Sequence, residues 1–136
     1  MTHLVFRLLG QALSGKNHLQ TTRYGRRYPT KAFAAWRDDM VVQLRQQHRE
    51  ARAKGVLPLR GPVALTAVFH HGDHRVRDLP GLLDALCHVL ERATVVADDG
   101  QIHAATLLTG YSCQAEVRFT LTPDGGDDHG ENLLEA

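Results

Sequence analysis

The fold of this chain is decided by the segment GDHRVRDLPGLLDALCHVLERATVVADDGQI, residues 72–102. After an opening polar loop, Pro80 stands where the first turn of a helix tolerates a missing N–H. Leucines and a valine then recur at intervals of three and four residues up to Arg92, which predicts an amphipathic helix. The apolar pair Val95–Val96 predicts a brief strand, and it leads into two aspartates and a turn at Gly100.

Outside this segment, short apolar runs accompany one long amphipathic stretch. Phe33, Trp36, Met40 and Leu44 recur at helical spacing, and Thr30 is a favoured residue for capping such a helix. Because strands outnumber helices, we predict an α+β fold, a mixed β-sheet with two main helices. The other expected elements are a helix over residues 31–54, strands over 4–9, 63–69, 101–108 and 112–121 with a turn at Gly110 between the last two, and a hairpin or basic loop over 23–29.

Length and composition indicate a single compact domain. The chain has 136 residues, of which 43% are hydrophobic and 23% charged, so it can bury a core. We place the domain at residues 1–122 and expect the acidic tail, residues 123–136, to be disordered. No apolar run is long enough to cross a bilayer, no secretory leader is evident, and Cys87 and Cys113 lack metal-ligand spacing. These features predict a reduced, cytoplasmic protein without a membrane partner.

The net charge of +1 conceals two halves of opposite sign. Residues 1–60 hold 12 Lys and Arg against 3 Asp and Glu, a net charge of +9, whereas residues 61–136 hold 4 against 12, a net charge of −8. A basic surface beside an acidic cluster suits a protein that binds nucleic acid and holds a metal ion. From charge alone, a solvated basic helix with an acidic tail remains an equal alternative.

Aspartates at the two ends of the 72–102 segment are the candidate catalytic residues. Asp78 precedes the predicted helix, and Asp98 and Asp99 follow the predicted short strand. If that strand packs beside the strand ending near Phe69, the aspartates meet at one end of the sheet, where their carboxylates suit Mg²⁺. Neighbours in an extended chain point to opposite faces, so one of the pair would face the metal and the other would cap the turn. The simpler alternative is that Asp78 only caps the helix and Asp-Asp-Gly is an ordinary turn.

Several motifs of this chain occur together, in the same order, in one known family. The arginine-rich loop 73–77 is followed by Asp78-Leu79-Pro80-Gly81, a helix over 82–91 and Asp98-Asp99-Gly100-Gln101-Ile102. Upstream stand Ser14-Gly15-Lys16-Asn17, the helix start at 29–36 and Gly61-Pro62-Val63. On these motifs, roughly residues 4–121 resemble the RusA family of Holliday junction resolvases, including its phage members.

The resemblance implies a homodimer that binds four-way DNA junctions and nicks two strands symmetrically with Mg²⁺, or with Mn²⁺ in its place. It implies metal binding and catalysis by Asp78 and Asp99, with Asp98 in a supporting role. Three positions depart from the family pattern, namely Pro80 at its second catalytic aspartate, Gly81 at the following asparagine and Asp84 at a helix lysine.

Two interpretations of these departures stay open. In the first, Asp84 replaces the lost carboxylate as a metal ligand, because it lies one helical turn after Pro80 on the same face. His88, a further turn along, would then orient Asp84 or join the site. In the second, the site is degenerate and the protein binds junctions with little or no cleavage, because a lost carboxylate and a lost cation weaken metal binding and transition-state stabilisation. Asp84 and His88 would then be a solvated pair opposite the leucines.

The expected DNA contacts come from basic residues spread over both halves of the chain. Histidines cluster at residues 70–74 and allow a zinc site, although loop histidines are more often exposed or in contact with phosphate. The predicted DNA-binding residues are Lys16, Arg23, Arg26, Arg27, Lys31, His74, Arg75 and Arg77.

Overall fold

The structure, a computed structural model, describes residues 3–14, 19–21, 25 and 27–123. It confirms the α+β class. Of the predicted tail, residues 123–136, Pro123 belongs to the last strand, and residues 124–136 lie outside the described residues. In chain order the elements are β1 (Leu4–Leu9), β2 (Leu19–Thr21), β3 (Arg27–Pro29), α1 (Lys31–Gln46), α2 (Arg49–Ala53), β4 (Val63–His71), α3 (Leu79–Arg92), the 3-10 turn η2 (Asp99–Gln101), β5 (Ile102–Tyr111) and β6 (Glu116–Pro123).

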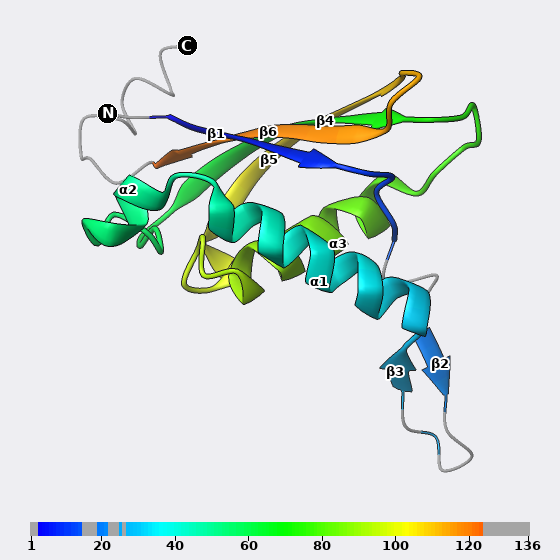
Figure 1. Cartoon of the computed structure of the whole chain (residues 1–136), viewed down its shortest axis with the longest axis horizontal. Coiled ribbons are helices and arrows are strands. Elements are labelled where there is room, and N and C mark those ends of the chain that lie inside the picture. The colour runs from blue at the N-terminus through cyan, green and yellow to red at the C-terminus, as the bar shows by residue number, and fades with distance from the viewer. Residues whose placement is uncertain (1–2, 15–18, 22–24, 26, 124–136) are drawn as a thin grey trace.

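Four strands form one mixed sheet in the order β1-β6-β4-β5, and β2 and β3 form a separate hairpin. Strand β6 runs antiparallel to both of its neighbours, whereas β4 and β5 are parallel. Parallel neighbours require a crossover connection, and α3 provides it. Figure 1 shows α1 and α3 on the same side of this sheet. The sheet is therefore an α+β arrangement with one face covered by helices.

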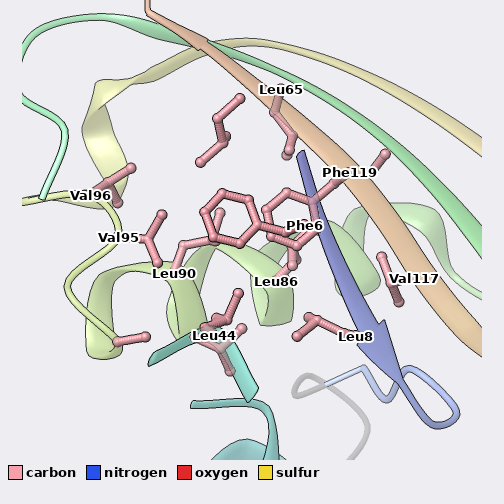
Figure 2. Close-up of a cluster of buried hydrophobic side chains, with 14 of the residues drawn as sticks. Phe6, Leu8, Leu44, Leu65, Leu86, Leu90, Val95, Val96, Val117 and Phe119 are labelled. Atoms are coloured by element: carbon pink, nitrogen blue, oxygen red, sulfur yellow. The ribbon is translucent and has the colours of Figure 1, made fainter. Parts of the chain in front are cut away.

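Alternating side chains of the sheet build the core between the strands and the helices. Phe6 of β1 and Phe119 of β6 stack with ring centroids 4.9 Å apart, and both are almost fully buried. Figure 2 shows Leu86 and Leu90 of α3 directed at this aromatic pair. Burial of the alternating faces fixes the register of the strands, because a slip of one residue would expose every core side chain.

Helix α1 begins as predicted and ends earlier. The Thr30 hydroxyl accepts a hydrogen bond of 3.1 Å from the Phe33 backbone N–H, which confirms it as the N-cap. The predicted continuous helix to residue 54 is wrong, since the chain leaves helical geometry at Gln47 and His48, and a short helix α2 follows. His48 adopts a left-handed conformation with φ of 55°. This break allows the side chains at the end of α1 to reach strand β1.

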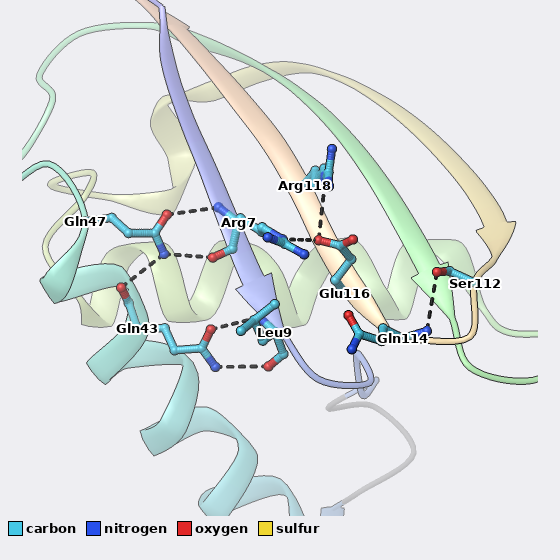
Figure 3. Close-up of polar contacts among 8 residues, drawn as sticks. All are labelled: Arg7, Leu9, Gln43, Gln47, Ser112, Gln114, Glu116 and Arg118. Carbon is cyan, nitrogen blue, oxygen red and sulfur yellow. Dashed lines mark hydrogen bonds and ion pairs between the residues drawn. The ribbon is translucent and has the colours of Figure 1, made fainter.

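Side chains at the end of α1 form hydrogen bonds with the backbone N–H and C=O groups on the outer edge of β1, as a neighbouring strand would (Figure 3). The Gln47 amide accepts from the Arg7 N–H at 2.9 Å and donates to the Arg7 carbonyl at 2.7 Å. The Gln43 amide makes the same pair of bonds to Leu9, at 2.8 and 3.0 Å. His48 adds a bond of 2.6 Å to the Val5 carbonyl. An edge strand with paired groups offers no template for association with another chain.

Removing both amides is expected to weaken this edge. In the variant Gln43→Ala/Gln47→Ala, four hydrogen bonds to β1 are lost, and we expect the free energy of unfolding to fall by about 2–4 kcal/mol. Urea denaturation monitored by circular dichroism measures the change. Gln46→Ala is the matched control, because Gln46 lies on the same helix and is exposed. An equal loss in that control would contradict the role given to the edge bonds.

Two further predictions of local structure need correction. The pair Val95–Val96 is not a strand, because Val96 makes only an isolated parallel bridge to Leu59. The chain also does not turn at Gly110, which pairs with His70 inside the β4–β5 ladder, and β5 continues to Tyr111. No helix within the described ranges is long and apolar enough to cross a membrane.

Candidate metal and nucleic-acid site

The Asp-Asp-Gly-Gln motif forms the short turn η2 immediately before β5. The Asp98 carboxylate accepts from the Gly100 N–H at 3.3 Å, and the Gln101 side chain accepts from the Asp98 N–H at 2.7 Å. The Asp98 side chain also accepts from the Gln101 backbone N–H, which completes a capping box, so Asp98 caps the turn. The sequence predicted that one of the two aspartates would do so without deciding which. The Gly100 N–H holds the pKa of Asp98 below its ordinary value, which keeps this carboxylate ionised at neutral pH.

Gln101 fastens this turn to the start of β4. Its amide donates to the carbonyl oxygens of Leu59 and Gly61, both at 2.8 Å, while its oxygen holds Asp98. The two aspartates are therefore positioned by a side chain that contacts two separate segments. The structure thus gives Gln101 a positioning role in this turn.

Gln101→Ala is expected to loosen the turn. Three hydrogen bonds disappear, so the free energy of unfolding should fall by about 2–3 kcal/mol. Affinity for Mn²⁺, measured by calorimetry on the folded variant, should fall as well, because the carboxylates are no longer held together. Gln114→Ala, an exposed glutamine in the β5–β6 connection, is the control. Unchanged Mn²⁺ affinity in Gln101→Ala would remove Gln101 from the positioning role.

Glu91 joins the aspartate pair, although the sequence did not indicate it. The Asp99 N–H donates to the Glu91 carboxylate at 3.1 Å. One carboxylate oxygen from each of Glu91, Asp98 and Asp99 lies within 4.8 Å of the others, and we call these three residues the acid cluster. Three converging carboxylates provide the hard oxygen ligands that Mg²⁺ and Mn²⁺ prefer.

The end of α3 explains why Glu91 reaches the motif. The chain reverses at Thr94, which has φ of 55°, so the last helical turn lies beside η2. Arg52 of α2 holds this reversal by donating to the Ala93 carbonyl at 2.9 Å and to the Thr94 hydroxyl at 2.6 Å. A cation at a helix C-terminus is also favoured by the helix dipole. A reversal of this kind, with Thr rather than Gly in the left-handed position, gives little signal in the sequence.

Asp84 lies next to the acid cluster without belonging to it. Asp84 and Asp99 line one shallow groove of about 290 Å³ together with Cys87 and His103. Burial, together with the nearby charges of Asp99 and Asp84, raises the pKa of the Cys87 thiol to about 11. The thiol is therefore protonated at neutral pH. The proposed compensation by Asp84 stays a prediction, and the structure instead brings Glu91 to the aspartates.

Asp78 lies at the other end of α3, away from the acid cluster. The expected meeting of Asp78 with Asp99 at one end of the sheet is wrong within a single chain. The aspartate pair precedes β5 beside the start of β4, where Val63 pairs with Ile102, whereas Asp78 follows the end of β4. Figure 1 shows these two regions at opposite ends of the sheet. The two regions are separated because β4 and β5 run parallel. The chain therefore has to return from the end of β4 to the start of β5, and α3 spans that distance.

The surroundings of Asp78 suit a ligand rather than a simple cap. Asp78 occupies the N-cap position of α3, but its side chain makes no capping hydrogen bond. It lines a pocket of about 360 Å³ with Ser14, Arg75 and Arg77. The Ser14 hydroxyl is buried and has no partner among the described residues. At Gly81 an added Cβ would lie 2.2 Å from that hydroxyl and 2.8 Å from the Asp78 carboxylate, so a larger residue there would displace both side chains.

The loop at residues 72–78, the arginine loop, holds its two arginines differently. The Arg77 guanidinium donates two hydrogen bonds, of 2.6 and 3.0 Å, to the two oxygens of the Asp73 carboxylate. This bidentate ion pair holds the pKa of Asp73 far below its ordinary range. The Arg75 side chain is exposed. His74 stacks on Tyr111 of β5 with ring centroids 4.2 Å apart. Of the two arginines, Arg75 is the better placed to meet a phosphate.

The other predicted contacts fall outside this region. Lys31 is exposed at the start of α1. Lys16, Arg23 and Arg26 lie outside the described residues, and for Arg27 the backbone in β3 is described. In the described part of the chain the acid cluster is the one group of three candidate metal ligands, so the histidines at residues 70–74 do not converge as a zinc site would require.

The chain was compared with models of known protein families and with curated proteins, and neither comparison produced a match. The likeness to the RusA family therefore rests on the motifs in the sequence.

Proposed function

We propose that this chain is a RusA-like, Mg²⁺-dependent endonuclease that resolves four-way DNA junctions by symmetric nicking. It would act as a cytoplasmic homodimer in recombination, repair or phage replication. The observation that carries this proposal is the acid cluster, because the Asp-Asp-x-Gln motif places two of its carboxylates and its glutamine fixes them in position.

The donor set of the acid cluster fits the proposed metal. Glu91, Asp98 and Asp99 offer carboxylate oxygens alone, which is the ligand type of Mg²⁺ and Mn²⁺ sites. When bound, such an ion supplies an activated water and stabilises negative charge on the scissile phosphate. The third carboxylate comes from Glu91, so the proline at position 80 does not leave the site with fewer than three.

Other residues would bind and orient the DNA. Arg75 is exposed in the arginine loop and supplies a cation for the backbone. The Ser14 hydroxyl lines the same pocket and offers a donor to a phosphate oxygen. The excess of basic residues in the first 60 positions would attract the junction from a distance, because clustered positive charge steers polyanions.

The second candidate is a junction-binding protein without useful cleavage. It is favoured by Pro80 and Asp84, which stand where the resemblance implies a carboxylate and a cation. Both candidates require the same basic surface. They differ only in the chemistry at the acid cluster.

One assay separates the two. A labelled four-way junction is incubated with the full chain over a range of Mg²⁺ or Mn²⁺ concentrations, and the products are resolved on a denaturing gel. We expect paired nicks on opposite strands, and no cleavage of a linear duplex at raised salt, where non-specific phosphate binding is weakened. Binding of the junction without nicks at any metal concentration would establish the second candidate instead.

A further inference from the structure

A groove beside α2, which we call the α2 groove, adjoins the acid cluster. It has a volume of about 690 Å³, and its apolar lining comes from Leu4, Ala51, Val56 and Leu59. Leu4 and Leu59 are buried, whereas Val56 is 49% exposed. Leu59 also connects the groove with the candidate site, because its carbonyl accepts a hydrogen bond from the Gln101 amide. A segment bound in this groove would therefore lie beside the acid cluster.

The α2 groove carries more positive than negative charge. Arg49 and Lys54 line it together with one acid, Glu50, which pairs with Lys54 at 3.0 Å. Arg49 has no ion pair within the described part of the chain. Burial and the nearby charge of Arg45 lower the pKa of Arg52, so basic residues gather here without matching acids. An apolar groove with a basic border suits a segment that combines acidic and apolar side chains.

The segment that follows Pro123 has this composition. Pro123 ends β6 and itself lines the groove, so the chain leaves the sheet beside α2 (Figure 1). Residues 124–136 lie outside the described residues. Their sequence, DGGDDHGENLLEA, contains five Asp and Glu, no Lys or Arg, and the apolar pair Leu133–Leu134. The pair Gly125–Gly126, close after the strand, permits the backbone to turn back towards the groove.

Attachment to the chain makes even weak docking effective. Leu133 is the tenth residue after Pro123, and ten residues can extend over about 33 Å, whereas the five residues of α2 are about 8 Å long. A segment on a short flexible linker has an effective concentration on the order of 1 mM at its site. An intrinsic dissociation constant of about 1 mM is therefore enough to fill half of the grooves.

We propose that residues 124–136 bind in the α2 groove of their own chain, with Leu133 and Leu134 against its apolar lining and the acidic residues against Arg49. The bound segment covers basic side chains that would attract the DNA backbone and places negative charge beside the acid cluster. A junction then has to displace the segment before it reaches that cluster. The docking stands by itself, whereas its effect on DNA rests on the proposed nuclease function.

Disulfide trapping tests the docking. In the variant Cys87→Ser/Cys113→Ser, Asn132→Cys is combined with Val56→Cys in the groove, or with Leu108→Cys on β5 as the control. Val56 and Leu108 are similarly exposed, at 49% and 56%. Because a disulfide requires close approach of the two residues, we expect it to form at least about ten times faster with Val56→Cys under mild oxidation. The product should have the monomer mass of 15.1 kDa.

A matched variant separates docking from chance encounter. Leu133→Ser/Leu134→Ser keeps the charge of the segment and removes its apolar side chains, so it should lower the rate with Val56→Cys to that of the Leu108→Cys control. Equal rates for the two cysteine pairs in the parent variant would overturn the proposal. A product of twice the monomer mass would also overturn it, because the groove would then take this segment from a second copy.

Junction affinity measures the effect on DNA. In the otherwise unchanged chain, Leu133→Ser/Leu134→Ser should bind a four-way junction about tenfold more tightly, the factor expected when nine-tenths of the grooves are occupied. Asn132→Ser is the control and should leave the affinity unchanged. Unchanged affinity in the leucine variant would overturn the regulatory role. A chain that traps the disulfide but never binds the junction would support the docking and remove the nuclease function, and with it the regulation.

Discussion

Replacement of Asp99 by asparagine is expected to lower Mg²⁺-dependent nicking of a four-way junction by at least about 100-fold, since even the loss of outer-shell partners of metal ligands costs roughly 10–100-fold. Asp99 combines two roles in the structure. Its carboxylate belongs to the acid cluster, and its backbone N–H anchors Glu91 at 3.1 Å. Asparagine keeps the shape and the backbone bond, so the variant removes only the charge.

The comparison variants define what this loss means. Asp84→Asn should stay within about tenfold of the wild-type rate, because the acid cluster remains complete. Junction affinity without metal should be unchanged in both variants, as measured by gel shift at fixed salt. An Asp99→Asn protein that nicks at the wild-type rate would remove the acid cluster from catalysis, and a greater loss in Asp84→Asn than in Asp99→Asn would favour compensation by Asp84.

Phe119→Ala is expected to lower the free energy of unfolding by about 3–5 kcal/mol. Phe119 lies on β6, a strand with a neighbour on each side, and is 1% exposed. Its ring stacks on Phe6, so truncation removes an aromatic contact and leaves a cavity beneath the sheet (Figure 2). A domain of this size has a total stability of roughly 5–15 kcal/mol, so the variant should be close to unfolding at physiological temperature.

Urea denaturation of Phe119→Ala and of Thr120→Ala measures this effect against a neighbour. Thr120 lies on the same strand but on the opposite face, and its replacement should cost less than about 1 kcal/mol. Similar midpoints for the two variants would mean that the core does not depend on the aromatic pair.

Elements with strong local signals were predictable from the sequence. The strand at Leu4–Leu9, the helix ending at Arg92 and the Thr30 cap occur where periodicity and capping chemistry placed them. The errors arose where tertiary contacts decide the structure. Nothing local shows that Gln47 and His48 bind the edge of β1 instead of extending α1, and the two-residue apolar run at residues 95–96 was too short to distinguish a strand from a single bridge.

The local structure of the candidate site could be predicted from the sequence, but which residues come together there could not. The motif at Asp98 and Gln101 gave the turn and the capping role, because both follow from neighbouring residues. Glu91 was missed, since its approach depends on the chain reversal at Thr94. The meeting of Asp78 with Asp99 was expected within one chain, because sequence spacing does not reveal that β4 and β5 run parallel.

Titration of Mn²⁺ into the protein tests the central claim most directly, namely that the acid cluster holds a metal ion. Glu91 supplies one of the three carboxylates of the cluster. Glu91→Gln should therefore bind Mn²⁺ at least about tenfold more weakly than the wild type, whereas Glu50→Gln, at an exposed glutamate of α2, should bind it unchanged. Equal Mn²⁺ affinity of the wild type and Glu91→Gln would contradict the account.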